Sequence, residues 1–189
     1  MDEMVKVAGK QDRTLDSMAF KSLVEVIEHH KTSAERGITF IHGEKSELSI
    51  SYANLYSRAV SILFALQERG LKPGDELISQ LYDTYDFLSV FWACLLGKII
   101  PIPLSVGNND EHRMKLFNVW RFLQNPHVIA SHDSFEKLEG LANNKNSGDA
   151  FTQIKKRLIF IESLGEEPKE GEIIPPQESD IAFIQFSSG

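Results

Sequence analysis

Short apolar runs alternate with longer stretches of helical periodicity between residues 77 and 161. Leu77 and Ile78 come first, followed by an apolar helical stretch over 84–96 and by a second apolar run over 99–104. Two parallel strands need a connection of roughly a dozen residues or more, and a helix of this length supplies it. The alternation therefore predicts an α/β fold in which helices flank a largely parallel sheet, with ligands bound beyond the carboxyl ends of the strands.

The other elements follow from the same two periodicities and from turn residues. Pro101 and Pro103 remove two ladder donors, which predicts that their strand ends there or lies at a sheet edge. Gly97 is expected to end the helix before that strand. The remaining predicted elements are an opening helix over 20–27 capped by Asp16 or Ser17, a hairpin of 38–41 with 48–51, a helix over 55–66 followed by a stop at Gly70, a helix over 116–123, a strand over 128–130, a short helix over 135–141, a polar loop over 143–148, a strand over 158–161, an exposed connection over 165–180 and a strand over 181–186.

Charge excludes one class of partner. The 189 residues include 27 Asp and Glu against 20 Lys and Arg, and the formal net charge of −7 repels nucleic acid phosphates. The densest basic cluster, over residues 155–157, directly precedes an apolar run and is interpreted as a solvated helix end or loop. Nucleic acid is therefore not an expected partner.

The cysteine content and the apolar segments bear on location. One cysteine excludes a disulfide within the chain, and the apolar surroundings of Cys94 predict an inert thiol in the core. The first residues are charged and lack the apolar core of a secretory signal. Lys98 and two prolines interrupt the longest apolar region, over 87–104. We therefore expect a cytoplasmic protein without a membrane span.

The chain ends with Ser187, Ser188 and Gly189, directly after the apolar run over 181–186. Glycine and small hydroxyl residues after a buried strand let backbone N–H groups approach a phosphate, and the hydroxyls add donors or a magnesium ligand. The same three residues also suit an ordinary turn. The local sequence leaves both interpretations open.

Four motifs resemble, in order, those of the adenylate-forming superfamily, which includes acyl-CoA synthetases, fatty acyl-AMP ligases and the adenylation domains of nonribosomal peptide synthetases. The last motif is similar to the first half of the superfamily's phosphate-binding signature. The resemblance implies a helical segment over 1–36 and, over 37–189, a partial AMP-binding domain that forms the N-terminal subdomain of the fold and is truncated within the phosphate-binding loop. The four motifs lie at 50–55, 71–75, 96–104 and 180–189.

The resemblance assigns a function to three residues. It implies that the Ser187 hydroxyl faces the β- and γ-phosphates of ATP, that Ser188 supports the shape of the loop and that Gly189 permits close backbone approach. In this superfamily a substrate carboxylate attacks the α-phosphate of ATP, pyrophosphate leaves, and a thiol then captures the acyl group. ATP and Mg²⁺ are therefore the implied cofactors, and no residue of this chain is assigned as a catalytic residue or a metal ligand.

The implied partners are a carboxylic acid, an acyl acceptor and the remainder of a longer parent chain. Residues 183–189 resemble fatty acyl-AMP ligases and the loading domains of peptide or polyketide assembly lines more than coenzyme A ligases. A carrier-protein phosphopantetheine thiol is therefore preferred to coenzyme A as the acceptor, and the 189-residue piece alone is expected to be inactive. The alternative is a stand-alone α/β binding or regulatory domain of flavodoxin-like architecture that ends in a serine turn.

Structural roles are predicted for the remaining aspartate, tryptophan and histidine side chains that could bind a ligand or a metal. Asp83 and Asp86 lie at the start of a helix, where carboxylates favour the helix dipole. Trp92 and Trp120 fall on apolar helix faces, which predicts positions in the core. The six histidines lack the ligand spacing of a metal site.

Overall fold

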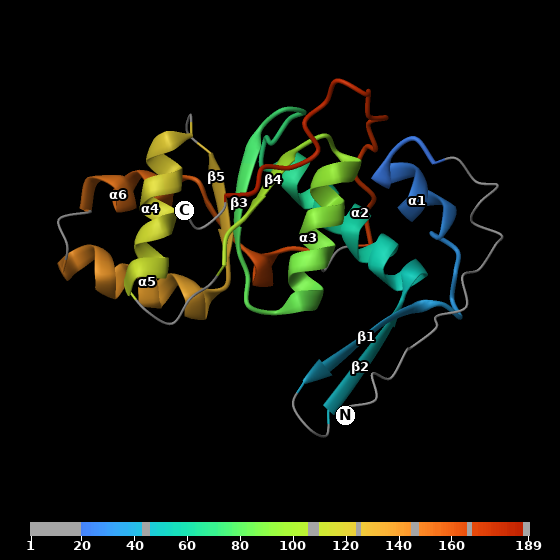
Figure 1. The fold of residues 1–189 in the computed structure, drawn as a ribbon, viewed down its shortest axis with the longest axis horizontal. Coiled ribbons are helices and arrows are strands. Elements are labelled where there is room, and N and C mark those ends of the chain that lie inside the picture. Colours follow the sequence, from blue (N-terminus) through green and yellow to red (C-terminus); the bar gives the residue numbers. More distant parts are fainter. Residues whose placement is uncertain are drawn as a thin grey trace, which may run out of the picture.

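The protein is built around a four-stranded sheet whose neighbouring strands are all parallel (Figure 1). The strand order is β4-β3-β5-β6. This confirms the predicted α/β fold with a parallel sheet. The strands are β3 (Glu76–Gln80), β4 (Ile100–Pro103), β5 (His127–Ala130) and β6 (Leu158–Phe160). The structure is a computed structural model that describes residues 20–42, 46–105, 110–123, 126–144, 148–165 and 168–186.

Helices lie on both sides of the sheet (Figure 1). Three helices lie towards one face: α1 (Leu23–His29), α2 (Tyr52–Glu68) and α3 (Thr84–Leu96). Three others cover the opposite face: α4 (Asp110–Phe122), α5 (His132–Asn144) and α6 (Gly148–Lys156). The predicted hairpin is formed by β1 (Gly37–His42) and β2 (Ser46–Ser51), and a short 3-10 helix, Ile161–Ser163, follows β6.

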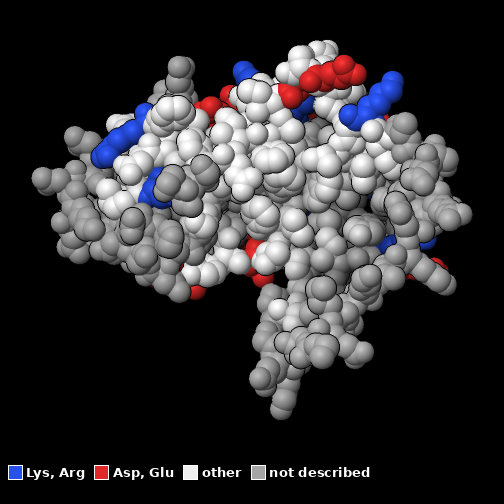
Figure 2. Space-filling model, viewed as in Figure 1, with Lys and Arg blue, Asp and Glu red and all other residues white. Residues whose placement is uncertain are grey.

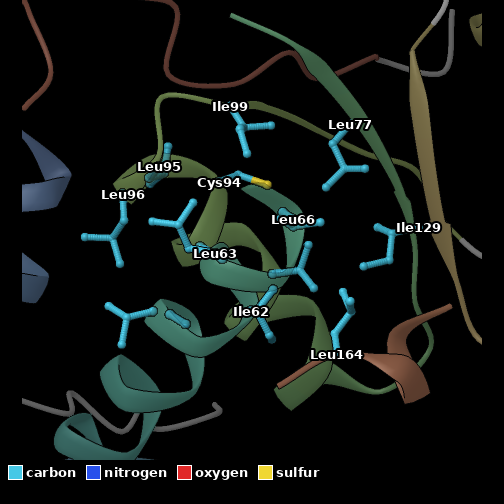
Figure 3. Close-up of a cluster of buried hydrophobic side chains, with 14 of the residues drawn as sticks. Ile62, Leu63, Leu66, Leu77, Cys94, Leu95, Leu96, Ile99, Ile129 and Leu164 are labelled. Carbon is cyan, nitrogen blue, oxygen red and sulfur yellow. The ribbon is translucent and has the colours of Figure 1, made fainter. Parts of the chain in front are cut away.

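The sheet separates two apolar cores. Successive residues of a strand point to opposite faces, so Leu77 packs in the core beneath α2 and α3 while Ile78 packs in the core beneath α4 and α6. Figure 3 shows Leu63, Leu66 and Cys94 pointing into the first core. Burial raises the pKa of the Cys94 thiol, which agrees with the predicted inert core position.

Strand β4 lies at the edge of the sheet, as its prolines predict. The N–H groups of Ile100 and Leu104 donate to the carbonyls of Asp75 and Ser79, so the even-numbered residues of this strand face β3. Pro101 and Pro103, the odd-numbered residues, therefore face the outer edge. A missing N–H at that edge removes no hydrogen bond to β3.

Two predicted boundaries are wrong. The opening helix begins later than expected, and its N-cap is Ser22, whose hydroxyl accepts from the Glu25 N–H at 3.2 Å. Asp16 and Ser17, the expected caps, lie outside the described residues. The predicted polar loop over 143–148 is too long, since α5 ends at Asn144 and α6 begins at Gly148. Phe151 and Ile154 of α6 are buried in the second core, and this packing outweighs weak local propensity. The last turn of α6 holds Lys155 and Lys156, where a helix end or loop is predicted.

None of the helices in the described part of the chain combines the length and the apolar character that a membrane span requires.

Helix α3 ends on Gly97, as predicted. The backbone conformation of this residue does not require a glycine, because its φ of −95° is one that other residues adopt readily. The left-handed conformation is found instead at Lys98, whose φ is 54°. A Cβ atom on Gly97 would lie 2.3 Å from the Cδ1 atom of Leu63, which is fully buried in α2. A side chain at this position would therefore force the buried Leu63 side chain to move.

We expect Gly97→Ala to destabilise the protein by about 1–3 kcal/mol, since the extra methyl group overpacks a core that has no room for it. Urea unfolding followed by circular dichroism measures the loss. In a Leu63→Ala background, where the clashing side chain is absent, the same substitution should cost much less. Equal costs in the two backgrounds would contradict the steric explanation.

Candidate functional site

The predicted phosphate-binding residues Ser187, Ser188 and Gly189 lie outside the described residues. The structure describes the chain up to Phe186. The candidate site is therefore built from residues 168–186, which lead to the loop and are called the lead-in segment below.

The lead-in segment is docked on α2 and α3 although it contains no helix or strand. The side-chain amide of Gln67 donates to the carbonyl of Glu172 and accepts from its N–H, both at 2.8 Å. The N–H of Gly171 donates to the Val60 carbonyl at 2.9 Å, and the N–H of Ile174 donates to the Leu96 carbonyl at 2.9 Å. The connection expected from the sequence is thus fixed to the helices by its backbone.

Gly171 allows this docking sterically. A Cβ atom at this position would lie 2.5 Å from the backbone nitrogen of Phe64 and 2.8 Å from the backbone carbon of Leu63. Backbone atoms inside a helix cannot move aside as the end of a side chain can. Any larger residue would therefore push the lead-in segment away from α2.

An ion pair holds the segment where it reaches the sheet. The Lys98 ammonium lies 2.7 Å from Oδ2 of Asp180, and the same oxygen accepts from the Gln177 N–H at 2.6 Å. The hydrogen bond from Lys98, with that from Gln177, holds the pKa of the Asp180 carboxyl below its usual value. The carbonyl of Lys98 also accepts from the Gly74 N–H at 2.7 Å, so this lysine joins the segment to the turn before β3.

The prediction of a strand over residues 181–186 is wrong, because the structure assigns no strand there. One backbone hydrogen bond joins this stretch to β4, from the Ile184 N–H to the Pro101 carbonyl at 3.1 Å. Pro101 and Pro103 have no N–H groups, so β4 cannot donate to the carbonyls of the segment. Half of the hydrogen bonds of a normal ladder are therefore excluded.

The lead-in segment nevertheless runs in the direction of β4. Asp180 contacts Lys98 and Ile184 bonds to Pro101, so both partners advance together along the chain. The segment thus runs parallel to β4 and towards the carboxyl ends of the strands. At its last described residue, the Lys115 ammonium lies 3.4 Å from the Phe186 carbonyl.

Four acidic and basic side chains near the carboxyl ends of the strands make structural contacts. Asp83 is the predicted N-cap of α3 and accepts from the Asp86 N–H at 2.8 Å. Asp86 pairs with Arg58, and the Glu162 carboxylate accepts from the N–H of His132 at 3.0 Å. Burial raises the pKa of the Asp86 carboxyl, and the Arg58 guanidinium opposes that rise. These residues have helix-capping and pairing roles, as predicted for Asp83 and Asp86.

A cavity of about 650 Å³ lies at the opposite edge of the sheet, where the strands begin. Its lining includes His127 and Arg157, whose Nε2 and Nη1 atoms are 3.4 Å apart, and the acidic residues Asp75 and Glu76. Burial and the neighbouring guanidinium lower the pKa of His127. Ile184 of the lead-in segment also lines this cavity, whereas the backbone of the segment continues towards the other ends of the strands.

Within the described residues, no three His, Cys, Asp or Glu side chains are grouped so that they could hold a metal ion. Trp92 and Trp120 are partly buried against the two cores, as predicted. Sequence reasoning missed Lys115 and Gln67, which contact the lead-in segment across 71 and 105 residues of sequence. No local pattern marks contacts of such separation.

We expect the docking of the lead-in segment to weaken in acid, because its anchor at Asp180 has a depressed pKa in the folded state. Such a carboxyl group stabilises the folded state at a pH above its pKa in the unfolded chain, which is 3.8. This stabilisation is lost as the pH falls through the lower pKa that the group has in the folded state. The hydrogen-exchange protection of the Ile184 amide should therefore fall more steeply between about pH 5 and about pH 3 in the native chain than in Asp180→Asn. Parallel pH profiles would contradict this role, and Lys98→Gln should behave like Asp180→Asn.

No model of a known protein family matches the chain. Several solved structures do. The McyG A-PCP structure complexed with phenylalanyl-adenylate is similar with a TM-score of 0.78 and 30% sequence identity, over 91% of this chain and 31% of that chain. The adenylation domain of a keto acid-selecting NRPS module, bound to keto acyl adenylate, is similar with a TM-score of 0.74 and 26% identity, over 86% of this chain and 30% of that chain.

The fatty acid AMP ligase from Legionella pneumophila shares the fold, with a TM-score of 0.71 and 24% identity over 96% of this chain and 30% of that chain. The chain thus spans about 30% of the length of each of these structures. The predicted relationship is confirmed by these likenesses. Over about nine tenths of its length, the chain has the structure of part of an adenylate-forming enzyme, in the superfamily of nonribosomal peptide synthetase adenylation domains and fatty acyl-AMP ligases.

Proposed function

We propose that this chain is the N-terminal part of an ATP-dependent ligase that activates a carboxylic acid as an acyl-adenylate and passes the acyl group to a thiol. A carboxylate oxygen would bond to the α-phosphorus of ATP as the bond to pyrophosphate breaks. The thiolate sulfur would then bond to the acyl carbon as AMP leaves. Two of the similar structures carry phenylalanyl-adenylate and keto acyl adenylate, which supports this class of reaction.

The observation that carries the proposal is the path of the lead-in segment. It runs parallel to β4, and the Lys115 ammonium holds its last described carbonyl, that of Phe186. Ser187, Ser188 and Gly189 follow next in the sequence. Hydroxyl and backbone N–H donors beside an ammonium group suit a triphosphate, and Mg²⁺ bound with ATP would offset the remaining phosphate charge.

The acceptor that we propose is the phosphopantetheine thiol of a carrier protein. One similar structure is an A-PCP structure, and another is an adenylation domain from an NRPS module, an enzyme of the assembly-line kind. The acid remains open among amino, keto and fatty acids, since similar structures of each kind cover most of this chain. Polyketide assembly lines are a further setting in which the same transfer would serve.

A second candidate is favoured by the strand order. The order β4-β3-β5-β6 corresponds to the first four strands of the flavodoxin-like arrangement, in which the order reverses between β3 and β5. A stand-alone binding domain of that kind would hold its ligand beyond the carboxyl ends of these two strands, near Tyr82 and Ser131. The two candidates therefore differ in where a nucleotide would bind.

Titration of the 189-residue chain with MgATP, followed by backbone amide NMR, separates them. We expect shifts at Lys115, Phe186 and the three residues that follow. Lys115→Met should weaken the response by a few-fold through the loss of one cation, whereas the matched variant Lys137→Met, whose ammonium lies over the ring of Tyr82, should not. Shifts centred on Tyr82 and Ser131 would refute the ligase assignment and support the stand-alone binding domain.

The 189-residue chain alone should not catalyse exchange between ATP and labelled pyrophosphate with any carboxylic acid, because it spans about 30% of the similar structures. Exchange by this piece would show that it is catalytically complete and would overturn this part of the proposal.

A longer protein that contains this chain should transfer its acyl group to a holo-carrier protein faster than to free coenzyme A. A thioester assay with both acceptors at equal concentration measures the preference. The apo-carrier protein, which lacks the phosphopantetheine thiol, is the control and should accept nothing. A higher rate with coenzyme A would refute the choice of acceptor.

A further inference from the structure

Lys98 has an unusual backbone conformation. Among the described residues it is the one residue other than glycine with a positive φ, at 54°. Its N–H donates to the Leu95 carbonyl at 3.3 Å, and the N–H of Ile99 donates to the Cys94 carbonyl at 2.9 Å. These two bonds form a motif that commonly closes helices, and glycine is the usual residue at the position that Lys98 occupies in it. A side chain here is therefore a local cost to folding.

The lysine side chain offsets this cost through one contact. A strained conformation persists only where the surrounding structure holds it in place. The carbonyl of Lys98 accepts from the Gly74 N–H, and the ammonium pairs with Asp180 of the lead-in segment. Any residue could supply the carbonyl. The ammonium is therefore the group for which a lysine is needed at this position.

The pair of Lys98 and Asp180 is partly shielded from solvent, since their side chains are 21% and 29% exposed. Both residues line a cavity of about 260 Å³, together with Lys21 and with Glu178 of the lead-in segment. Figure 2 shows acidic and basic side chains together at the top of the molecule, where the lead-in segment passes the end of α3. Attraction between opposite charges therefore holds the segment between its contacts with α3 and its contact with β4.

The backbone alone specifies the register of the lead-in segment on β4 only weakly. Over residues 180–186, the one hydrogen bond between the described backbones runs from the Ile184 N–H to the Pro101 carbonyl. A slip by one residue would move the segment by about 3.3 Å and exchange the faces to which its side chains point. The ammonium groups of Lys98 and Lys115 resist such a slip from the two ends of this stretch.

We propose that Lys98 is a positioning residue for the phosphate-binding loop: its ammonium sets the register of the lead-in segment on β4 and thereby the place at which residues 187–189 begin. The inference rests on the proposed ligase function, because it concerns the same loop. Lys98 acts through the segment and contacts neither ATP nor the acid. Loss of its ammonium should therefore weaken the binding of MgATP and leave the chemical steps and the recognition of the acid unchanged.

Pyrophosphate-exchange kinetics of a longer protein that contains this chain test the inference. Lys98→Ala should raise the KM for ATP roughly two- to five-fold, as expected for the loss of one partly exposed ion pair, and should leave kcat and the KM for the acid unchanged. Asp180→Asn should have the same effect, and the double variant should be no worse than either single variant. Lys98→Arg keeps the cation and should keep most of the native affinity. The matched control is Lys72→Ala, which removes an exposed lysine before β3 and should leave the KM for ATP unchanged.

Lys98→Gly separates positioning from stability. Glycine removes the ammonium as alanine does, but it adopts the left-handed conformation without strain, so Lys98→Gly should unfold at a higher urea concentration than Lys98→Ala. The KM for ATP should nevertheless be raised equally in the two variants. A KM that recovers together with stability in Lys98→Gly would reduce Lys98 to a structural role and overturn the inference. A KM that Lys98→Ala leaves unchanged would overturn it equally.

The hydrogen-exchange protection of the Ile184 amide in the 189-residue chain reports the register without a nucleotide. Lys98→Ala should lower this protection and Lys72→Ala should not, and circular dichroism identifies folded protein. Equal protection in the two variants would contradict the role of Lys98. If the unaltered longer protein catalyses no pyrophosphate exchange with amino, keto or fatty acids, the proposed function is wrong, and the Ile184 amide still decides whether Lys98 sets the register.

Discussion

The close contact between α2 and the end of α3 governs the C-terminal part of the protein. Gly97 has no side chain, so Leu63 fills the space beside it and the two helices form one packed layer on the sheet. The lead-in segment then bonds to both helices, at the Val60 and Leu96 carbonyls. Lys98, the residue after the glycine, joins that segment to the start of β3 through its side chain and its carbonyl. The lead-in segment is thus anchored to both helices of this layer.

The second constraint is the lack of donors along the outer edge of β4. Two prolines there accept but cannot donate, so the final segment is held by side chains and one ladder bond. This arrangement brings the chain towards the carboxyl ends of the strands. The same feature therefore supports the proposed nucleotide site.

The sequence predicts the parallel sheet and the hairpin well because each rests on local periodicity. Thr84–Leu96, for example, is apolar nearly all round and is bounded by an aspartate cap and a glycine, so its limits are marked. Helix α6 was missed because its buried residues, Phe151 and Ile154, gain their stability from α4 and α5 and not from local propensity. The strand over 181–186 was mispredicted because its pattern says nothing of the partner beside it.

In the candidate site too, local motifs could be predicted from the sequence and contacts between distant residues could not. Ser187, Ser188 and Gly189 are predicted from the sequence as phosphate-binding residues because a phosphate loop is a contiguous motif with a fixed chemical purpose. Its supports, Lys115 and Gln67, lie 71 and 105 residues from the groups that they hold, and only the folded chain brings them together.

By itself, the sequence determined the class of fold and the edge position of β4, since each depends on residue type and spacing over a few turns. The tertiary structure alone decided how the lead-in segment is anchored and which helices it contacts. Those properties depend on contacts between distant residues, whose formation is set by packing and by the hydrogen-bond donors that two prolines withhold.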